Sequence, residues 1–238
     1  MLFLSAQVRA DLERWVQAGY PHETCGVLVG READGLSRVL CAVQARNRNG
    51  ERPGDRYELD PGDHLAADME ARSRGLSIVG IWHSHPDHPA EPSEADRAGA
   101  WEGWSYLILS VGAGGVTDLR TWRLVGGLFK EDELRIMSKA VIRIPTPLRG
   151  FSRGQDEVPV ECVTVSEALW QLGERAPGIL ERVLDGSGRL RPFVNVFVGQ
   201  SDVRTLQGLE TLVPESAVIS IVPAVAGGRQ EAAHRRTP

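Results

Sequence analysis

The sequence predicts an α+β protein made of two successive domains, and three of its features indicate this. Segments with the alternating or continuously apolar pattern of strands are mixed with segments of helical periodicity, without the regular strand and helix alternation of a parallel sheet. A glycine pair at residues 126–127, followed shortly by the polar run KEDELR, interrupts the pattern. A chain of 238 residues is long enough for two domains to bury a core each.

The first half of the chain is expected to form a mixed sheet flanked by helices, and this domain spans residues 1–126. Ser5 is suited to cap a first helix, and an Asp34-Gly35 turn joins two strands. Leu65 and Met69 are expected to face inward from a second helix. The expected helices cover residues 5–20, 61–74 and 93–101, and the expected strands cover residues 26–30, 36–45, 57–59, 76–82, 106–111 and 117–125.

The second half of the chain is expected to form a smaller domain after a linker at residues 127–139. Its elements follow in the order strand, strand, helix, which indicates a β-grasp type of unit. The domain spans residues 140–228, and a polar and basic tail follows at residues 229–238. The expected strands cover residues 140–144, 158–163, 193–198 and 217–222, and the expected helix covers residues 166–175.

The composition argues against several classes of protein. With 27 Lys and Arg against 32 Asp and Glu, the net charge of -5 provides no basic surface for nucleic acid or an anionic membrane. Cys25, Cys41 and Cys162 are too widely spaced to indicate a disulfide framework or a thiolate zinc site. The first residues have too few apolar side chains for a signal peptide, and no run has transmembrane length. A cytoplasmic protein is therefore expected.

The stretch IWHSHPDHPAEPSEAD, residues 81–96, has the composition of a metal site. His83 and His85 follow a buried strand, where side chains at positions i and i+2 point the same way. Asp96, on a following helix, can supply a third ligand. Two histidines and one carboxylate leave a fourth zinc position open for water, as in catalytic zinc sites. Glu23, just before the first predicted strand, is the candidate general base.

Each of these residues has a simpler interpretation when it is considered alone. The pattern Ser93-x-x-Asp96 is also that of a helix capping box, and an isolated histidine or glutamate is unremarkable. His88 and His64 are assigned no role. Cys25 has no paired histidine and is expected to be a small buried residue.

In combination, the same residues closely resemble the JAMM (MPN+) metalloprotease family over residues 3–125. The resemblance rests on the spacing from His83 and His85 to Ser93 and Asp96, with Glu23 upstream in PHETCG. It implies a JAMM-type mixed sheet, with His83, His85 and Asp96 as zinc ligands. It further implies Glu23 as the acid/base and Ser93 as a hydrogen-bond donor to the tetrahedral oxyanion. Members of this family cut peptide or isopeptide bonds that follow the diglycine of ubiquitin-like proteins.

The second domain resembles the MoaD/ThiS sulfur carriers, which are ubiquitin-like β-grasp proteins. The resemblance rests on the segments VIRIPTPLR, VTVSEALWQL, RPFVNVFVG and VISIVPAVAGG, the last of which ends in Gly227-Gly228. It implies that a ubiquitin-activating-like adenylyltransferase activates the carboxylate of the final glycine. That carboxylate is then converted to a thiocarboxylate, which donates sulfur.

The diglycine is followed by further residues, and this departs from the carrier pattern. The carboxylate of Gly228 is tied up in the peptide bond to Arg229, so the carrier as encoded is inert. The leading hypothesis is a zinc-dependent hydrolase that cuts after Gly228, in its own or another copy of the chain. Removal of residues 229–238 would then allow Gly228 to be activated.

Three alternatives remain open at the level of sequence. The chain is chiefly a carrier or ubiquitin-like modifier precursor, whose tail another protease removes. Or it is an enzyme that releases an amino acid such as cysteine from a carrier, or deconjugates a modified protein. In the simplest alternative, Gly227-Gly228 belongs to a flexible terminus without function.

Overall fold

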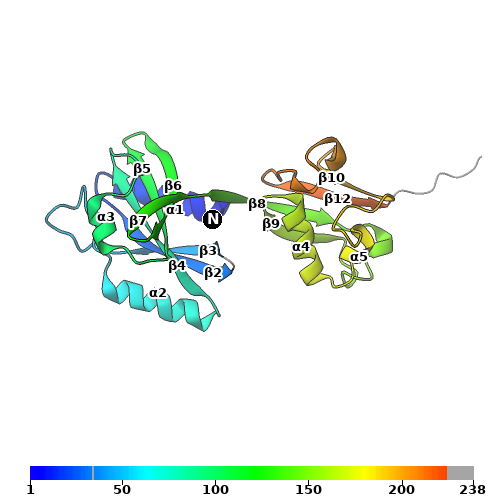
Figure 1. The fold of residues 1–238 in the computed structure, drawn as a ribbon, viewed down its shortest axis with the longest axis horizontal. Helices are drawn as coiled ribbons and strands as arrows, with labels where there is room; N and C mark the ends of the chain where they lie inside the picture. The colour runs from blue at the N-terminus through cyan, green and yellow to red at the C-terminus, as the bar shows by residue number, and fades with distance from the viewer. Residues whose placement is uncertain (34, 224–238) are drawn as a thin grey trace, which may run out of the picture. The chain divides into compact units, whose positions relative to one another are not determined.

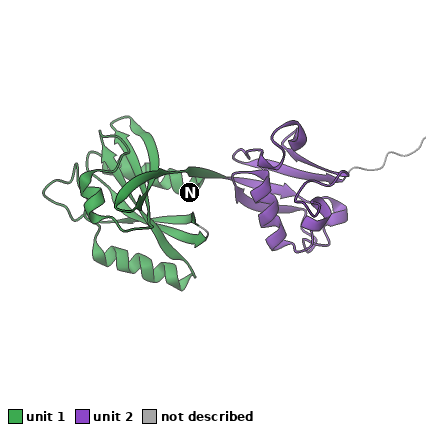
Figure 2. Ribbon diagram, in the orientation of Figure 1, with its two compact units in different colours: residues 1–137 green, residues 138–238 purple. Residues whose placement is uncertain are grey.

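The computed structural model describes residues 1–33 and 35–223, which fall into two compact units (Figure 2). Unit 1 covers residues 1–137, and unit 2 begins at residue 138. Both units combine strands and helices, which confirms the predicted α+β class. Within the described residues, every helix falls short of the length and apolar character needed to cross a membrane. Asp34 of the predicted turn, and Gly227, Gly228 and Arg229 at the predicted cleavage site, lie outside the described residues.

Unit 1 is a mixed sheet with helices on both faces (Figure 1). Strands β4 and β5 are parallel to each other, and β1 is parallel to both of its neighbours. The helices are α1 (Ala6–Gly19), α2 (Pro61–Ser73) and α3 (Glu94–Gly99). In spatial order the strands are β8 (Leu134–Arg143), β1 (Leu2–Ser5), β3 (Leu36–Ala45), β2 (Cys25–Ala33), β4 (Ser77–Pro86), β5 (Ser105–Gly112), β6 (Gly115–Val125) and β7 (Leu128–Asp132).

The two faces of this sheet form separate cores, because successive side chains of a strand point to opposite sides. On β2, Leu28 belongs to the same core as Leu12 of α1. Its neighbours Val27 and Val29 belong to the other core, together with Ala67 of α2. Figure 1 accordingly shows α2 lying along the outside of β2 and β4. The sheet is thus buried on both faces around the strand that carries the two histidines.

The first helix is confirmed, and its start follows from a local hydrogen bond. The side chain of Ser5 accepts from the backbone amide of Val8 (3.1 Å), as an N-cap residue does. The preceding strand β1 was not predicted. Its four residues are all buried, but a run so short has no periodicity by which it can be recognised.

The prediction for the inward face of α2 is wrong. Leu65 and Met69 are 60% and 65% exposed, whereas Ala67 and Ala71 are buried. Residues 65 and 69 are two positions away from the alanines, which places them about 200° around the helix. The small methyl groups of the alanines allow α2 to lie close to the sheet, and the larger side chains remain in solvent.

The expected linker at residues 127–139 is folded. Gly126 and Gly127 have φ angles of +62° and +76°, a conformation that glycine adopts readily, and they form the tight turn between β6 and β7. Strand β8 follows at once. Its first half pairs with β1 in unit 1, and its second half pairs with strands of unit 2. The division after Met137 therefore falls inside a strand. Residues 57–59, expected as a strand, contribute only a bridge from Leu59 to Asn47.

Unit 2 has the predicted β-grasp arrangement. The second half of β8 lies between β9, to which it is antiparallel, and β12, to which it is parallel. Helix α4 packs Leu169 and Leu172 against the core of this sheet. The elements are β9 (Glu157–Cys162), α4 (Val165–Arg175), α5 (Leu180–Val183), β10 (Val194–Val198), β11 (Ser201–Asp202), β12 (Ala217–Pro223), and the 3-10 helices Thr146–Leu148, Val203–Thr205 and Gly208–Glu210.

The substitution Gly26→Ala is expected to destabilise unit 1. A Cβ at this position would lie 2.0 Å from the carbonyl oxygen of Val43 and 2.6 Å from the indole nitrogen of Trp82. Relief of this overlap should cost about 1–3 kcal/mol, the usual range for overpacking. Denaturation followed by tryptophan fluorescence measures the loss. The control is Gly50→Ala, where the added Cβ meets nothing within 4 Å. Equal stability of the two variants would contradict the expectation.

Candidate metal centre

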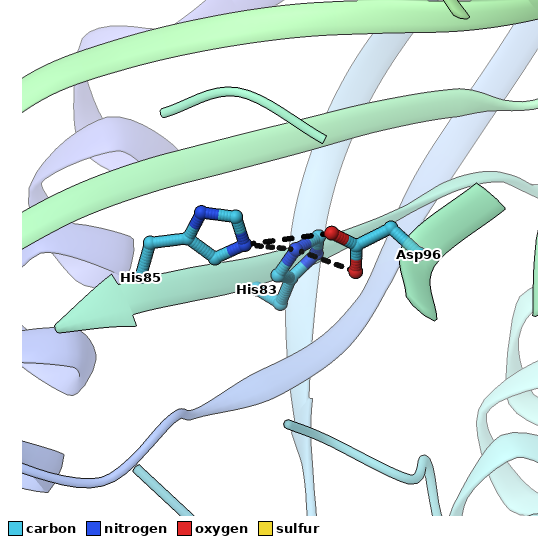
Figure 3. Close-up of side chains that lie close together, drawn as sticks. All are labelled: His83, His85 and Asp96. Atoms are coloured by element: carbon cyan, nitrogen blue, oxygen red, sulfur yellow. Dashed lines mark hydrogen bonds and ion pairs between the residues drawn. The ribbon is translucent and has the colours of Figure 1, made fainter. Parts of the chain in front are cut away.

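Two histidines of β4 and one aspartate of α3 converge on one point (Figure 3). His83 is fully buried, and His85 and Asp96 are 7% and 8% exposed. His83 Nε2 lies 3.1 Å from His85 Nε2 and 3.2 Å from Asp96 Oδ1. His85 Nε2 lies 3.5 Å from Asp96 Oδ2. Both imidazoles therefore direct the same ring nitrogen toward the carboxylate.

The orientation of His85 is set by the loop that follows β4. Its Nδ1 lies 2.8 Å from the carbonyl oxygen of Pro89. A carbonyl only accepts, so Nδ1 carries a proton and Nε2 faces the cluster. There Nε2 donates to Asp96 when the ring is protonated and offers its lone pair to a metal ion when the ring is neutral. The neighbouring carbonyls are held as well, since Ser110 Oγ donates to His88 (2.7 Å) and Trp122 Nε1 donates to Ala90 (2.9 Å). This loop is therefore a fixed support for the orientation of His85, a candidate metal ligand.

Asp96 is held by the capping box that its sequence pattern predicts. The backbone amide and the hydroxyl of Ser93 both donate to Asp96 Oδ2 (2.7 Å each), and the amide of Asp96 donates to Ser93 Oγ (3.1 Å). Burial opposes ionisation of this carboxyl. The hydrogen bonds from His83, His85 and Ser93 nevertheless hold the pKa of Asp96 well below its usual range. The carboxylate is thus anchored and charged.

Glu23, just before β2, is 6% exposed, and burial raises its pKa from 4.5 to about 7. The charges of His85 and Asp96 act on it in opposite directions, which places all three side chains within one electrostatic environment. A carboxyl group with a pKa near neutrality can both take up and release a proton at physiological pH.

A pocket of about 760 Å³ adjoins Glu23 between β3 and α2. Cys41 and Val43 line it on the side of the sheet, and Ala67 and Arg74 line it on the side of the helix. The small side chains of α2 leave room here. Glu23 is itself one of the residues that line the pocket.

The structure adds Tyr57 to the predicted site residues. Its ring stacks on that of His83 with 4.4 Å between the centroids and 28° between the planes. Nothing in the local sequence marks this tyrosine, since it belongs to an irregular loop.

Two residues that received no role in the sequence have clear surroundings in the structure. Cys25 is buried as predicted, and burial followed by the nearby charge of Glu23 raises the pKa of its thiol to about 12. It is therefore a thiol rather than a reactive thiolate. His64, which had no identified partner, lies against the rings of Trp101 and Trp104.

The donor set fits a zinc ion. Two imidazole nitrogens and one carboxylate oxygen can be chosen that all lie within 4.8 Å of one another. Burial lowers the pKa of His83, which favours the neutral form that binds metals. His83 Nδ1 is buried and has no hydrogen-bond partner among the described residues, where the polar contacts of this ring are made through Nε2, toward the cluster. Three protein ligands and an open position are typical of catalytic zinc.

Comparison with protein families divides the chain in the same way as the fold. A model described as prokaryotic homologs of the JAB domain matches residues 5–125. The model of the ThiS family matches residues 142–228. The first match contains all five predicted residues of the metal site, and the second contains the diglycine.

Individual relatives resemble one part of the chain or the other. A desampylase of Haloferax volcanii is 34% identical over 122 residues, which is 51% of this chain and 79% of that protein. The sulfur carrier protein CysO of Mycobacterium tuberculosis is 39% identical over 89 residues, which is 37% of this chain and 96% of that protein. A solution structure from Desulfitobacterium hafniense superposes with a TM-score of 0.52 at 25% identity, over 57% of this chain and 92% of that one.

Replacement of Asp96 by Asn should abolish stoichiometric binding of zinc. The amide keeps the shape of the side chain but loses its charge, and the apparent affinity is expected to fall by at least about 100-fold. Metal content after dialysis against a zinc buffer measures the change. Asp118→Asn, which alters an exposed carboxylate paired with Arg120, is the matched control. Retention of zinc by Asp96→Asn would show that the cluster is not the metal site.

In the metal-free protein, Glu23 should make stability depend on pH. Its pKa is about 7 in the folded chain and near 4.5 when unfolded, so the folded state binds more protons between these values. Stability should therefore fall as the pH rises from 4.5 to 7, by on the order of 2–3 kcal/mol. Denaturant unfolding of the wild type and Glu23→Gln across this range tests the expectation. Parallel pH profiles of the two proteins would contradict it.

Proposed function

This chain belongs to the family of prokaryotic JAB-domain proteins, and from this we propose that unit 1 is a zinc-dependent hydrolase whose substrate is the diglycine tail of a carrier such as unit 2. The observation that carries the proposal is the convergence of His83, His85 and Asp96 beside a carboxyl group whose pKa is near neutrality. The bond to be cut is the amide between Gly228 and Arg229.

His83, His85 and Asp96 would hold the zinc ion. When bound, zinc supplies Lewis-acid chemistry, lowering the pKa of water to about 7 and polarising a carbonyl. Glu23 takes a proton from the attacking water and passes it to the nitrogen of Arg229. The carbon–nitrogen bond breaks, Gly228 gains a carboxylate, and the tail leaves with a free amine.

Ser93 is proposed to donate a hydrogen bond to the oxyanion that forms at the carbonyl of Gly228. Its hydroxyl donates to Asp96 Oδ2, but its backbone amide donates to the same oxygen at the same distance of 2.7 Å. The hydroxyl can therefore turn toward the substrate without releasing the carboxylate. The role of Ser93 thus requires only rotation of the hydroxyl hydrogen about the Cβ–Oγ bond, with Oγ still accepting from the amide of Asp96.

The pocket between β3 and α2 is proposed to receive the residues before the diglycine. Positions 224–226 are Ala, Val and Ala, which suit the alanines at 66, 67 and 71 on the helical wall of the pocket, a wall that Asp63, Glu70 and Arg74 also line. Glycines without Cβ can then extend past Glu23 to the metal ligands. The pocket selects a carrier by the short apolar stretch that precedes its two glycines.

The cut would convert unit 2 from a blocked precursor to a usable carrier. An adenylyltransferase of the ubiquitin-activating type is the proposed partner that activates the new carboxylate of Gly228, in the cytoplasm. A carrier joined to another protein through its diglycine is a second candidate substrate, favoured by the likeness to a desampylase.

The proposal predicts that the purified zinc-loaded chain loses residues 229–238, and that Glu23→Gln loses them only at a slow residual rate. Intact mass spectrometry follows the loss. A mixture of catalytic chain and tagged Glu23→Gln chain separates cleavage of another copy from cleavage of the same copy. The carrier-only alternative would be supported if the zinc-loaded wild type leaves the tail intact both in its own chain and in the tagged Glu23→Gln chain.

A further inference from the structure

The loop between β3 and α2 is joined to the catalytic region by the side chain of Asn47. Its Nδ2 donates to the carbonyl oxygens of Glu23 and Arg56 (3.1 Å each). Its Oδ1 accepts from the backbone amides of Asn49 (2.9 Å) and Glu58 (3.0 Å). An amide side chain offers two donor hydrogens and two acceptor sites. All four are used.

Two of these hydrogen bonds are made to the residues immediately before and after Tyr57 in the sequence. Asn47 holds the carbonyl of the residue before Tyr57 and the amide of the residue after it. The ring between these two anchors stacks on His83, one of the proposed metal ligands. The same amide therefore controls where the loop places its aromatic ring against the metal centre.

The loop also reaches the candidate base through its backbone. The amide of Glu23 donates to the carbonyl oxygen of Pro53 (2.6 Å), while the carbonyl of Glu23 accepts from Asn47. Both backbone groups of Glu23 are thus held by one loop. The position of its carboxyl group depends on that loop keeping its shape.

The base of the loop has anchors of its own. The backbone amide of Arg48 donates to the carbonyl oxygen of Glu58 (2.8 Å), and the backbone amide of Asp60 donates to the carbonyl oxygen of Arg46 (3.1 Å). These backbone bonds close the loop without Asn47. The side chain of Asn47 instead connects the closed loop to Glu23, so its loss should loosen that connection before it opens the loop.

We infer that Asn47 is a positioning residue of the hydrolase, which sets the places of Glu23 and Tyr57 relative to the metal ligands. The inference rests on the proposed function, since it assumes that Glu23 is the base. Asn47 acts through Glu23 and not through contact with the carrier. Its loss should therefore slow the chemical step more than it weakens substrate binding.

The variant Asn47→Asp removes both donated hydrogen bonds and keeps both accepted ones. The measured reaction is removal of residues 229–238 from an added Glu23→Gln chain. For this reaction Asn47→Asp should lower kcat about 10- to 100-fold with little change in KM, the effect of a misplaced catalytic group. Asn49→Asp is the matched control. It introduces the same charge in the same loop and keeps the oxygen that accepts from the amide of Arg52 (2.9 Å). Each kcat is divided by the zinc-loaded fraction, so that partial unfolding does not mimic the effect.

A double-mutant comparison separates positioning from general damage. If Asn47 acts through Glu23, Asn47→Asp should cause no further loss in the Glu23→Gln background. Exchange of the Glu23 amide hydrogen, measured by NMR on the metal-free protein, should be faster in Asn47→Asp than in Asn49→Asp. This readout does not depend on activity.

Wild-type kcat in Asn47→Asp, equal losses in the two Asp variants, or a fully additive loss with Glu23→Gln would each overturn the inference. Unchanged exchange at the Glu23 amide would overturn it as well. A wild-type chain that hydrolyses nothing would instead refute the proposed function. In that case the exchange measurement still decides whether Asn47 holds Glu23 in place.

Discussion

The carboxylate of Asp96, buried between two imidazoles, is the interaction on which the site depends. A buried charge is costly unless partners compensate it, and here His83, His85 and Ser93 supply them. Each partner is fixed by a different part of unit 1. Strand β4 aligns the histidines, the first turn of α3 holds Asp96, and hydrogen bonds from β5 and β6 hold the intervening loop. The fold of unit 1 thereby holds a charged carboxylate next to the Nε2 atoms of two imidazoles.

Two carboxyl groups of the site have opposite properties because their surroundings differ. Asp96 accepts several hydrogen bonds, which keep it ionised. Glu23 is at least as buried, and desolvation is the largest influence on both carboxyl groups. For Glu23 the remaining influences are only the charges of His85, Asp96 and Asp55, so desolvation prevails and favours the protonated form. A permanently charged carboxylate suits a cation, and one that titrates near neutrality suits proton transfer. The assignment of ligand and base therefore agrees with the electrostatics of the two positions.

Local patterns predicted most of the fold and the elements that bring His83, His85 and Asp96 together. The spacing of His83 and His85 needs only the period of a strand, and the capping box of Asp96 needs only the start of a helix. The orientation of α2 could not be predicted in this way, because its close approach depends on alanines meeting the sheet. Tyr57 and Asn47 were missed for a similar reason. Their roles arise from contacts across an irregular loop, which no periodicity marks.

Strand β8 joins the two units directly, because it pairs with β1 up to Met137 and with β9 from Ser138 onward. A cut after Gly228 would therefore discard only the tail and leave the catalyst and its product as one polypeptide. Each copy would undergo its own maturation once and irreversibly, yet retain a hydrolase for later substrates. The activating partner would have to accept a carrier that remains fused to a hydrolase domain.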